Sequence, residues 1–166
     1  DMQRSALYAG AGAPMTVASR ATIRQALASQ LAATGVMPTA KGNIYGYMRS
    51  GFAGLSPVVR VLSGGSVRPR TPQHGTPSRF LYTVQLWVLY FDDGNAAQQA
   101  AAEDTLDALE AELTAWLGNE SVRNQVGLWR DLAWYDASRI DVRQIGTKAG
   151  SIYIVEDVPI EVTVDG

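Results

Sequence analysis

The most constraining feature of this chain is a long strand-like segment at residues 79–91. Side chains alternate between the two faces of a strand, and one face of this segment is uniformly apolar. That face carries Phe80, Tyr82, Val84, Leu86, Val88 and Tyr90. In the second half the other face is apolar too, with Trp87, Leu89 and Phe91. We therefore expect this strand to be central in a sheet or covered by a partner, with Trp87 in the core.

An amphipathic helix is predicted soon after this strand, over residues 96–117, with a turn at residues 92–95 between them. Apolar side chains recur in the helix at steps of three and four, which is the spacing of one helix face. This stripe consists of Ala102, Leu106, Leu109, Leu113, Trp116 and Leu117. We expect Trp116 to face the sheet and to lie in the core.

The rest of the chain predicts one more helix and several strands. A helix capped by Thr16 or Ser19 has its apolar positions at Ile23, Leu27 and Leu31. Strands are expected at residues 43–49 and 57–62, and within residues 132–144 and 151–164. Pro159 indicates that part of the last strand lies at an edge or a bend. The predicted fold class is α+β, a mostly antiparallel sheet with two amphipathic helices packed on one face.

The length of 166 residues fits one domain. A domain of this size buries roughly 70% of its unfolded surface, so it needs no disulfide or metal to fold. We expect an Ala/Gly-rich arm at residues 1–15 and a single domain at residues 16–166, with a long loop at residues 63–78. Met2 and Met15 are both candidate natural starts, and the first residues lack the pattern of a secretory signal. No apolar run approaches the ~20 residues of a membrane span.

Charge is strongly segregated along the chain, although the net charge is only -2. Residues 1–79 hold nine Lys/Arg and one Asp, whereas residues 92–120 hold eight Asp/Glu and no Lys/Arg. One interpretation is nucleic-acid binding by the basic half. The other is head-to-tail self-association, in which the basic part of one copy meets the acidic part of the next.

The sequence offers little for catalysis, metal binding or cofactor binding. The single histidine, His74, lies in a Pro/Gly-rich loop without a patterned acid or nucleophile beside it. Residues 92–95 resemble part of a calcium loop but lack its alternating oxygen ligands and its distal glutamate. Neither Gly10-Ala11-Gly12 nor Gly64-Gly65 has the strand and helix that a phosphate loop needs. The absence of cysteine removes thiolate sites. We therefore assign no catalytic, cofactor or metal residues and expect a protein that is not an enzyme.

Two charged groups are instead candidates for an interface between subunits. The first is the arginines of the predicted loop, and the second is the acidic residues of the second helix. The candidate residues are Arg68, Arg70, Arg79, Asp104, Asp107, Glu110 and Glu112. A solvated loop and a solvated helix face are the simpler interpretation. Neutralisation of the two groups within one subunit is the competing alternative to a contact between copies.

The order of elements resembles that of phage tail terminator, or tail completion, proteins of long-tailed phages. The opening helix, residues 19–27, is similar to the first helix of that family. The apolar strand at residues 80–91, the acidic turn Asp92-Asp93-Gly94 and the helix at 96–117, followed by two strands, resemble its α+β core. The resemblance covers residues 16–164 and is one of order and pattern.

The resemblance implies a structural virion protein with no catalytic residues. Such proteins form rings, typically hexamers, that cap the tail tube and join it to the head. It implies as partners further copies of the chain, the tail tube protein and a head-closure or other neck protein. Genomic DNA would pass through the lumen without sequence recognition, and assembly would occur in the bacterial cytoplasm. Other ring-forming neck or tube proteins, and a small nucleic-acid-binding module, are the alternatives.

Overall fold

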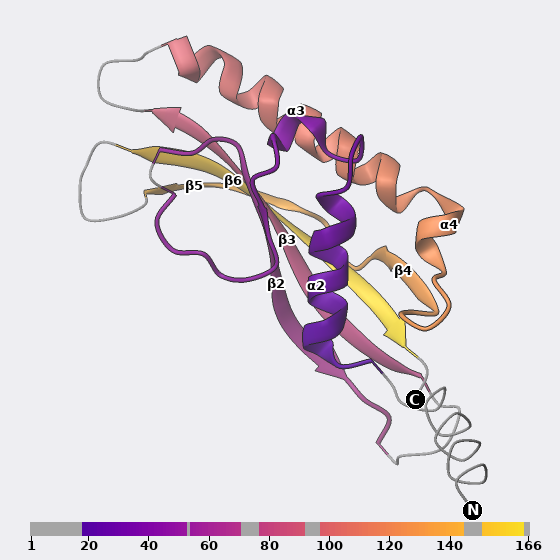
Figure 1. Cartoon of the computed structure of the whole chain (residues 1–166). Helices are drawn as coiled ribbons and strands as arrows, with labels where there is room; N and C mark the ends of the chain where they lie inside the picture. The colour runs from indigo at the N-terminus through magenta and orange to yellow at the C-terminus, as the bar shows by residue number, and fades with distance from the viewer. Residues whose placement is uncertain (1–17, 53, 71–76, 92–96, 145–150, 165–166) are drawn as a thin grey trace, which may run out of the picture.

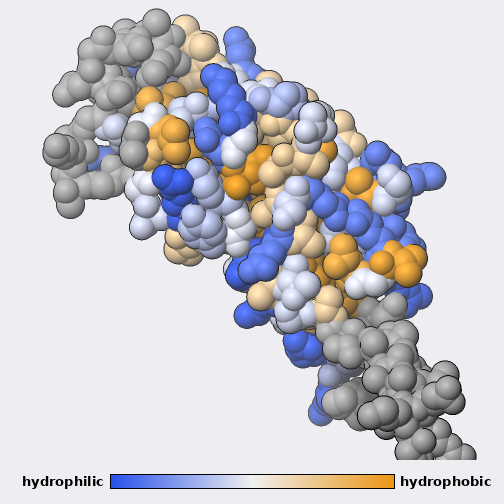
Figure 2. Space-filling view, in the orientation of Figure 1, coloured by the Kyte–Doolittle hydropathy of each residue, from blue (hydrophilic) through white to orange (hydrophobic). Residues whose placement is uncertain are grey.

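A computed structural model describes residues 18–52, 54–70, 77–91, 97–144 and 151–164. In these ranges a six-stranded sheet carries its helices on one face (Figure 1). Figure 2 shows hydrophilic and hydrophobic residues side by side on the surface seen from the same direction. The helical elements are α2 (Arg20–Leu31), the 3-10 helix η2 (Pro38–Ala40), α3 (Ala97–Leu117) and α4 (Glu120–Arg123). The strands are β1 (Ile44–Tyr45), β2 (Val58–Val67), β3 (Ser78–Phe91), β4 (Asp131–Trp134), β5 (Arg139–Gln144) and β6 (Ile152–Val164).

The sheet has the order β1-β2-β3-β6-β4, and β5 also pairs with β6. All pairs are antiparallel except β1 with β2, which is parallel. A mostly antiparallel sheet with both amphipathic helices on one face confirms the predicted α+β class. The sheet is visibly twisted along β3 and β6 (Figure 1), as strand sterics require.

The long strand β3 is internal, as its two apolar faces predict, because β2 and β6 pair with it on either side. Its helix-side face packs into the main core with α2 and α3. On the opposite face Trp87 and Leu89 form a second buried cluster with Phe52, Val58, Tyr153 and Val155. A segment before β2 therefore covers the face that the helices leave open.

Both predicted helices pack through their predicted apolar stripes. Ser19 caps α2, and its hydroxyl accepts the Thr22 N–H at 3.1 Å. All predicted apolar positions of the two helices are buried in the main core: Ile23, Leu27, Leu31, Ala102, Leu106, Leu109, Leu113, Trp116 and Leu117. Trp87 is also buried, but in the second cluster, away from the helices. None of the helices in the described ranges is long and apolar enough to cross a membrane.

The loop predicted at residues 63–78 is shorter than expected. Residues 63–67 continue β2, and Ser78 begins β3. Gly64 and Gly65 weaken a strand taken alone, but antiparallel pairing with β3 gives this stretch backbone partners, with a bulge between Ser63 and Gly65. Residues 71–76 and the predicted arm at 1–15 lie outside the described residues.

The strand predicted at residues 43–49 is reduced to Ile44–Tyr45. Beyond it the chain runs against α2, where the Arg24 Nε–H donates to the Gly46 carbonyl at 2.8 Å. A Cβ on Gly46 would lie 3.0 Å from the Ala28 Cβ, so a larger residue here would have to push this segment and α2 slightly apart. The contact with α2 replaces further pairing with β2.

Residues 132–144 contain parts of two strands, β4 and β5, where one was predicted. Both pair with β6, β4 with its end and β5 with its beginning. Pro159 pairs with β3 on one side and lies on the other side at the break between these two partners, so this part of β6 is a local edge, one of the two settings that Pro159 predicted. The Pro159 carbonyl accepts the Tyr135 N–H at 3.1 Å, so it points toward this break. The N–H that proline lacks would point the same way, where neither β4 nor β5 pairs with β6.

Candidate functional site

The predicted arginines lie at one end of the molecule, where β2 ends and β3 begins. Arg79 is paired in register with Val67, and its guanidinium lies 3.5 Å from the Glu161 carboxylate. The Arg68 guanidinium lies over the Phe80 ring, 5.3 Å from its centroid. Arg70 is exposed.

Arg20 of α2 joins this group, because its guanidinium donates to the Ser66 hydroxyl at 3.2 Å. Sequence reasoning counted its charge but did not place it with the loop arginines. We call Arg20, Arg68, Arg70 and Arg79 the basic end. All four side chains belong to exposed residues, so their charges face solvent.

Three of the four predicted acidic residues of α3 lie on its two flanks. On one flank the Glu112 carboxylate accepts the Thr39 N–H at 2.8 Å, which fastens η2 to the helix. On the other flank lie Asp107 and Glu110, whose spacing of three places them side by side. Asp104 and Asp107 are exposed, and Glu110 is partly buried.

The structure does not join these two charged groups within one subunit. Among the described residues, no ion pair links Arg68, Arg70 or Arg79 to an acidic residue of α3, and Arg79 pairs with Glu161 instead. The alternative of direct neutralisation inside the subunit is therefore not realised in the described part of the chain. A contact between copies stays a prediction.

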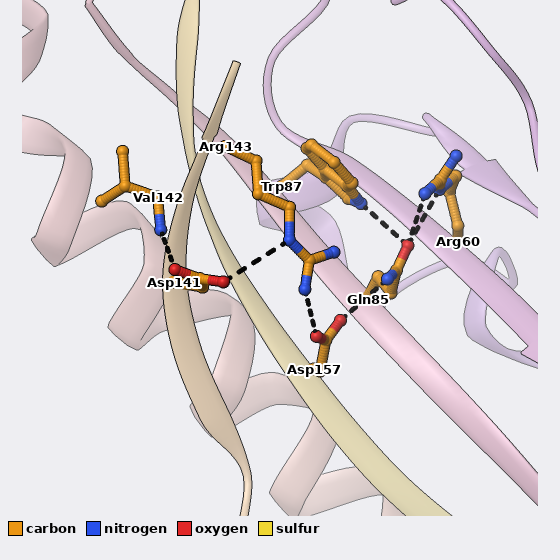
Figure 3. A network of polar contacts seen from close by, with 7 residues as sticks. All are labelled: Arg60, Gln85, Trp87, Asp141, Val142, Arg143 and Asp157. Carbon is orange, nitrogen blue, oxygen red and sulfur yellow. Dashed lines mark hydrogen bonds and ion pairs between the residues drawn. The ribbon is translucent and has the colours of Figure 1, made fainter. Parts of the chain in front are cut away.

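A network of polar side chains lies on the face opposite the helices, and sequence reasoning missed it (Figure 3). At its centre the Gln85 carbonyl oxygen accepts N–H groups from Arg60, at 2.6 and 3.1 Å, and from the Trp87 indole, at 3.2 Å. The Gln85 amide donates to Asp157 at 2.8 Å, and Asp157 also accepts from Arg143 at 2.6 Å. Four strands, β2, β3, β5 and β6, contribute these side chains.

The network also supports the aromatic cluster beside it. The Arg60 guanidinium lies 4.9 Å from the centroid of Trp87 and 5.5 Å from that of Phe52. Burial lowers the pKa of Arg60, nearby Arg143 lowers it further, and Asp157 opposes the change. Phe52, Trp87 and Tyr153 meet edge to face. These polar side chains hydrogen-bond to one another, so they join neighbouring strands. The arrangement does not resemble a reactive site. The only sequence signal was a glutamine on the same face as Trp87.

Glu156 is a second buried polar group, on the helix side of β6. Its exposed fraction is 4%, and its neighbours on this face are Ile154 and Val158. Burial raises the pKa of Glu156, a hydrogen bond from Ser138 opposes the increase, and the negative charges of Glu110 and Asp107 add to it. The flank of α3 that carries these two acids therefore lies toward β6, which α3 contacts. The sequence gave no sign that Glu156, and not the acids Asp157 and Glu161 of the same strand, would be buried near α3.

Within the described residues, no group of three or more potential metal ligands comes together. His74 and residues 92–95 lie outside them. A surface hollow of about 450 Å³ between α2 and β1 is lined by Arg24, Gln25, Ala28, Ser29, Ala32, Ile44, Gly46 and Tyr47. It is open and holds no acid, so it offers no pair of acid and base groups. The charged surfaces are thus the features on which a function can be argued. Neither a protein-family model nor a curated protein sequence matches this chain.

Proposed function

We propose that this chain is a structural subunit that forms a ring at the end of a phage tail tube and joins the tube to the head. The observation that carries the proposal is the separation of charge onto two surfaces of one domain. The basic end gathers four arginines, while one flank of α3 carries Asp107 and Glu110. Two different surfaces that complement each other suit a head-to-tail contact.

The order of elements also supports the proposal. A capped helix precedes the sheet, and the long strand β3 is followed by the long helix α3 and then by further strands. These are the elements on which the resemblance to tail terminator proteins depends. In such a ring the tube protein and a neck protein would contact opposite sides, and DNA would pass through the lumen without sequence readout.

Class averages of the purified protein by electron microscopy test the proposal directly. We expect closed rings, with six subunits as the most frequent number. Sedimentation measurements over a range of concentrations would give the mass of the same particle. Two-fold dimers, open filaments or a monomer at every concentration would contradict the proposal.

Nucleic-acid binding is the second candidate, because exposed Arg20, Arg68 and Arg70 lie together without an acid among residues 18–70. Contacts between arginine and phosphate release counterions, so affinity would fall steeply with added salt. Fluorescence anisotropy with a labelled DNA duplex at two salt concentrations separates the candidates. Tight binding that salt abolishes, by a protein that remains monomeric, would favour the module over the ring.

A further inference from the structure

The strand β5 is unusual in this sheet because its apolar side chains face solvent. Ile140 and Val142 are 61% and 58% exposed. Their partners in register on β6, Glu156 and Ile154, are buried on the helix side of the sheet. Ile140 and Val142 therefore belong to the same face as α3, at an edge where no described element covers them. Exposed apolar side chains with polar neighbours often mark binding surfaces.

Acidic side chains of α3 lie on the same face of the sheet as this apolar pair. α3 contacts β6, where the negative charges of Asp107 and Glu110 raise the pKa of Glu156, and Glu156 is the register partner of Ile140. We call Asp107, Glu110, Ile140 and Val142 the α3–β5 surface; Glu156 itself is buried and is not part of it. This surface combines an apolar centre with negative charge, so its partner should offer apolar contact and positive charge.

We infer that the α3–β5 surface binds the basic end of a second copy of this chain. The basic end carries the complementary positive charge, and exposed Val67, the register partner of Arg79, offers an apolar contact there. Ile140 and Val142 would then contact apolar atoms of the next copy, while its arginines approach Asp107 and Glu110. The inference rests on the proposed function, because a ring of this kind needs two different surfaces on each subunit.

The contact is made by side chains and not by adding a strand to the sheet. An open sheet edge can pair with another strand through its free N–H groups. Here the Asp141 carboxylate accepts the N–H of Val142 at 2.9 Å, in the middle of β5. This bond occupies one of the backbone donors that strand addition would use, which favours a contact through the apolar side chains and the nearby carboxylates.

Crosslinking between two single-cysteine variants tests the inference. The chain has no cysteine of its own, so each introduced thiol is unique. Val142→Cys and Arg68→Cys proteins are mixed and treated with a short bis-maleimide. The control replaces Val142→Cys by Val126→Cys, at a fully exposed residue between α4 and β4. Melting temperatures of all three variants show that each is folded.

We expect a crosslinked dimer from the Val142 and Arg68 variants, and at least about tenfold less from the control, as contact residues and distant residues should differ. If electron microscopy shows rings but the control pair crosslinks equally well, the inference fails and the proposed function stands. If the Val142 and Arg68 variants crosslink but the particles are not closed rings, the inference stands and the proposed function fails. A protein that never associates overturns both.

Discussion

On one face of β3, Phe80, Tyr82 and Val84 pack against two regular helices, whereas on the other face Trp87 packs against a segment around Phe52 that is neither helix nor strand. The helix side is filled by apolar side chains that repeat at fixed spacings. The opposite side combines three aromatic rings with arginines, a glutamine and carboxylates. The helix side is thus stabilised mainly by apolar packing, and the opposite side by packing together with a network of hydrogen bonds between side chains.

The comparison shows why the two faces differ in what they tolerate. An apolar core loses stability mainly through cavities, because its atoms have no directional bonds. A buried polar network loses stability when one partner is removed, because the remaining groups are left without a hydrogen bond. Substitutions on each face can separate the two mechanisms.

The largest effect is expected from Trp116→Ala on the helix side. Trp116 is buried between α3 and the sheet, so its truncation leaves a large cavity and should lower the free energy of unfolding by about 3–5 kcal/mol. A denaturant titration measures this loss. Ala115, the adjacent exposed residue, provides the control, and Ala115→Ser should change the same quantity by less than about 0.5 kcal/mol. A loss below about 1 kcal/mol for Trp116→Ala would show that the helix face is wrongly assigned.

A smaller loss is expected from Gln85→Met on the opposite face. Methionine fills a similar volume but removes the oxygen that accepts N–H groups from Arg60 and Trp87. Leaving these donors without a partner should cost about 1–3 kcal/mol. Thr83→Val, two residues away on the same face, is the control and should cost less than Gln85→Met. Equal losses for both variants would mean that packing, not the network, stabilises this face.

Glu156→Gln should stabilise the protein, in a way that depends on pH. Glu156 faces Ser138, Glu110 and Asp107, and its folded pKa is raised above the ordinary value of 4.5 mainly by burial. Below that ordinary value the carboxyl is protonated in both the folded and the unfolded state, so its ionisation does not change the free energy of unfolding. As the pH rises through 4.5 toward the folded pKa, the unfolded chain loses its proton first, and stability falls.

A glutamine side chain does not ionise, so the Glu156→Gln variant lacks this fall in stability with rising pH. Its melting temperature should exceed that of the original chain at neutral pH and approach it near pH 3.5, an estimate of about one unit below the ordinary glutamate pKa. Thermal melts at several pH values measure the difference. The same difference at every pH would show that the effect comes from shape or packing and not from ionisation.

The smallest effect on stability is expected from Ile140→Ser combined with Val142→Ser. Both side chains are mostly exposed, so the free energy of unfolding of the monomer should change by no more than about 1 kcal/mol. Self-association should weaken by about tenfold or more, because the apolar centre of the contact is lost. Sedimentation velocity measures association, and a denaturant titration measures folding. Unchanged association would exclude these side chains from the contact.

Much of the fold could be predicted because its main signals are local. The alternation of residues 79–91 and the helical spacing from Ala102 to Leu117 follow from strand and helix geometry, and the structure confirms both. The Ser19 cap was likewise readable, because the capping bond reaches only to Thr22. Pro159 predicted an edge or a bend, but not that the edge is a break between β4 and β5, because the local sequence does not mark where those two strands pair.

The sequence by itself determined the internal strand, the two helix faces and the separation of charge, since each depends on the order of residues along the chain. Only the tertiary structure decided that Glu112 bonds to Thr39 while Asp107 and Glu110 lie near Glu156. It also brought Gln85 to Arg60 and Asp157, and left Ile140 and Val142 uncovered. These outcomes depend on which strands pair and in what register, and register is fixed by contacts between residues far apart in the sequence.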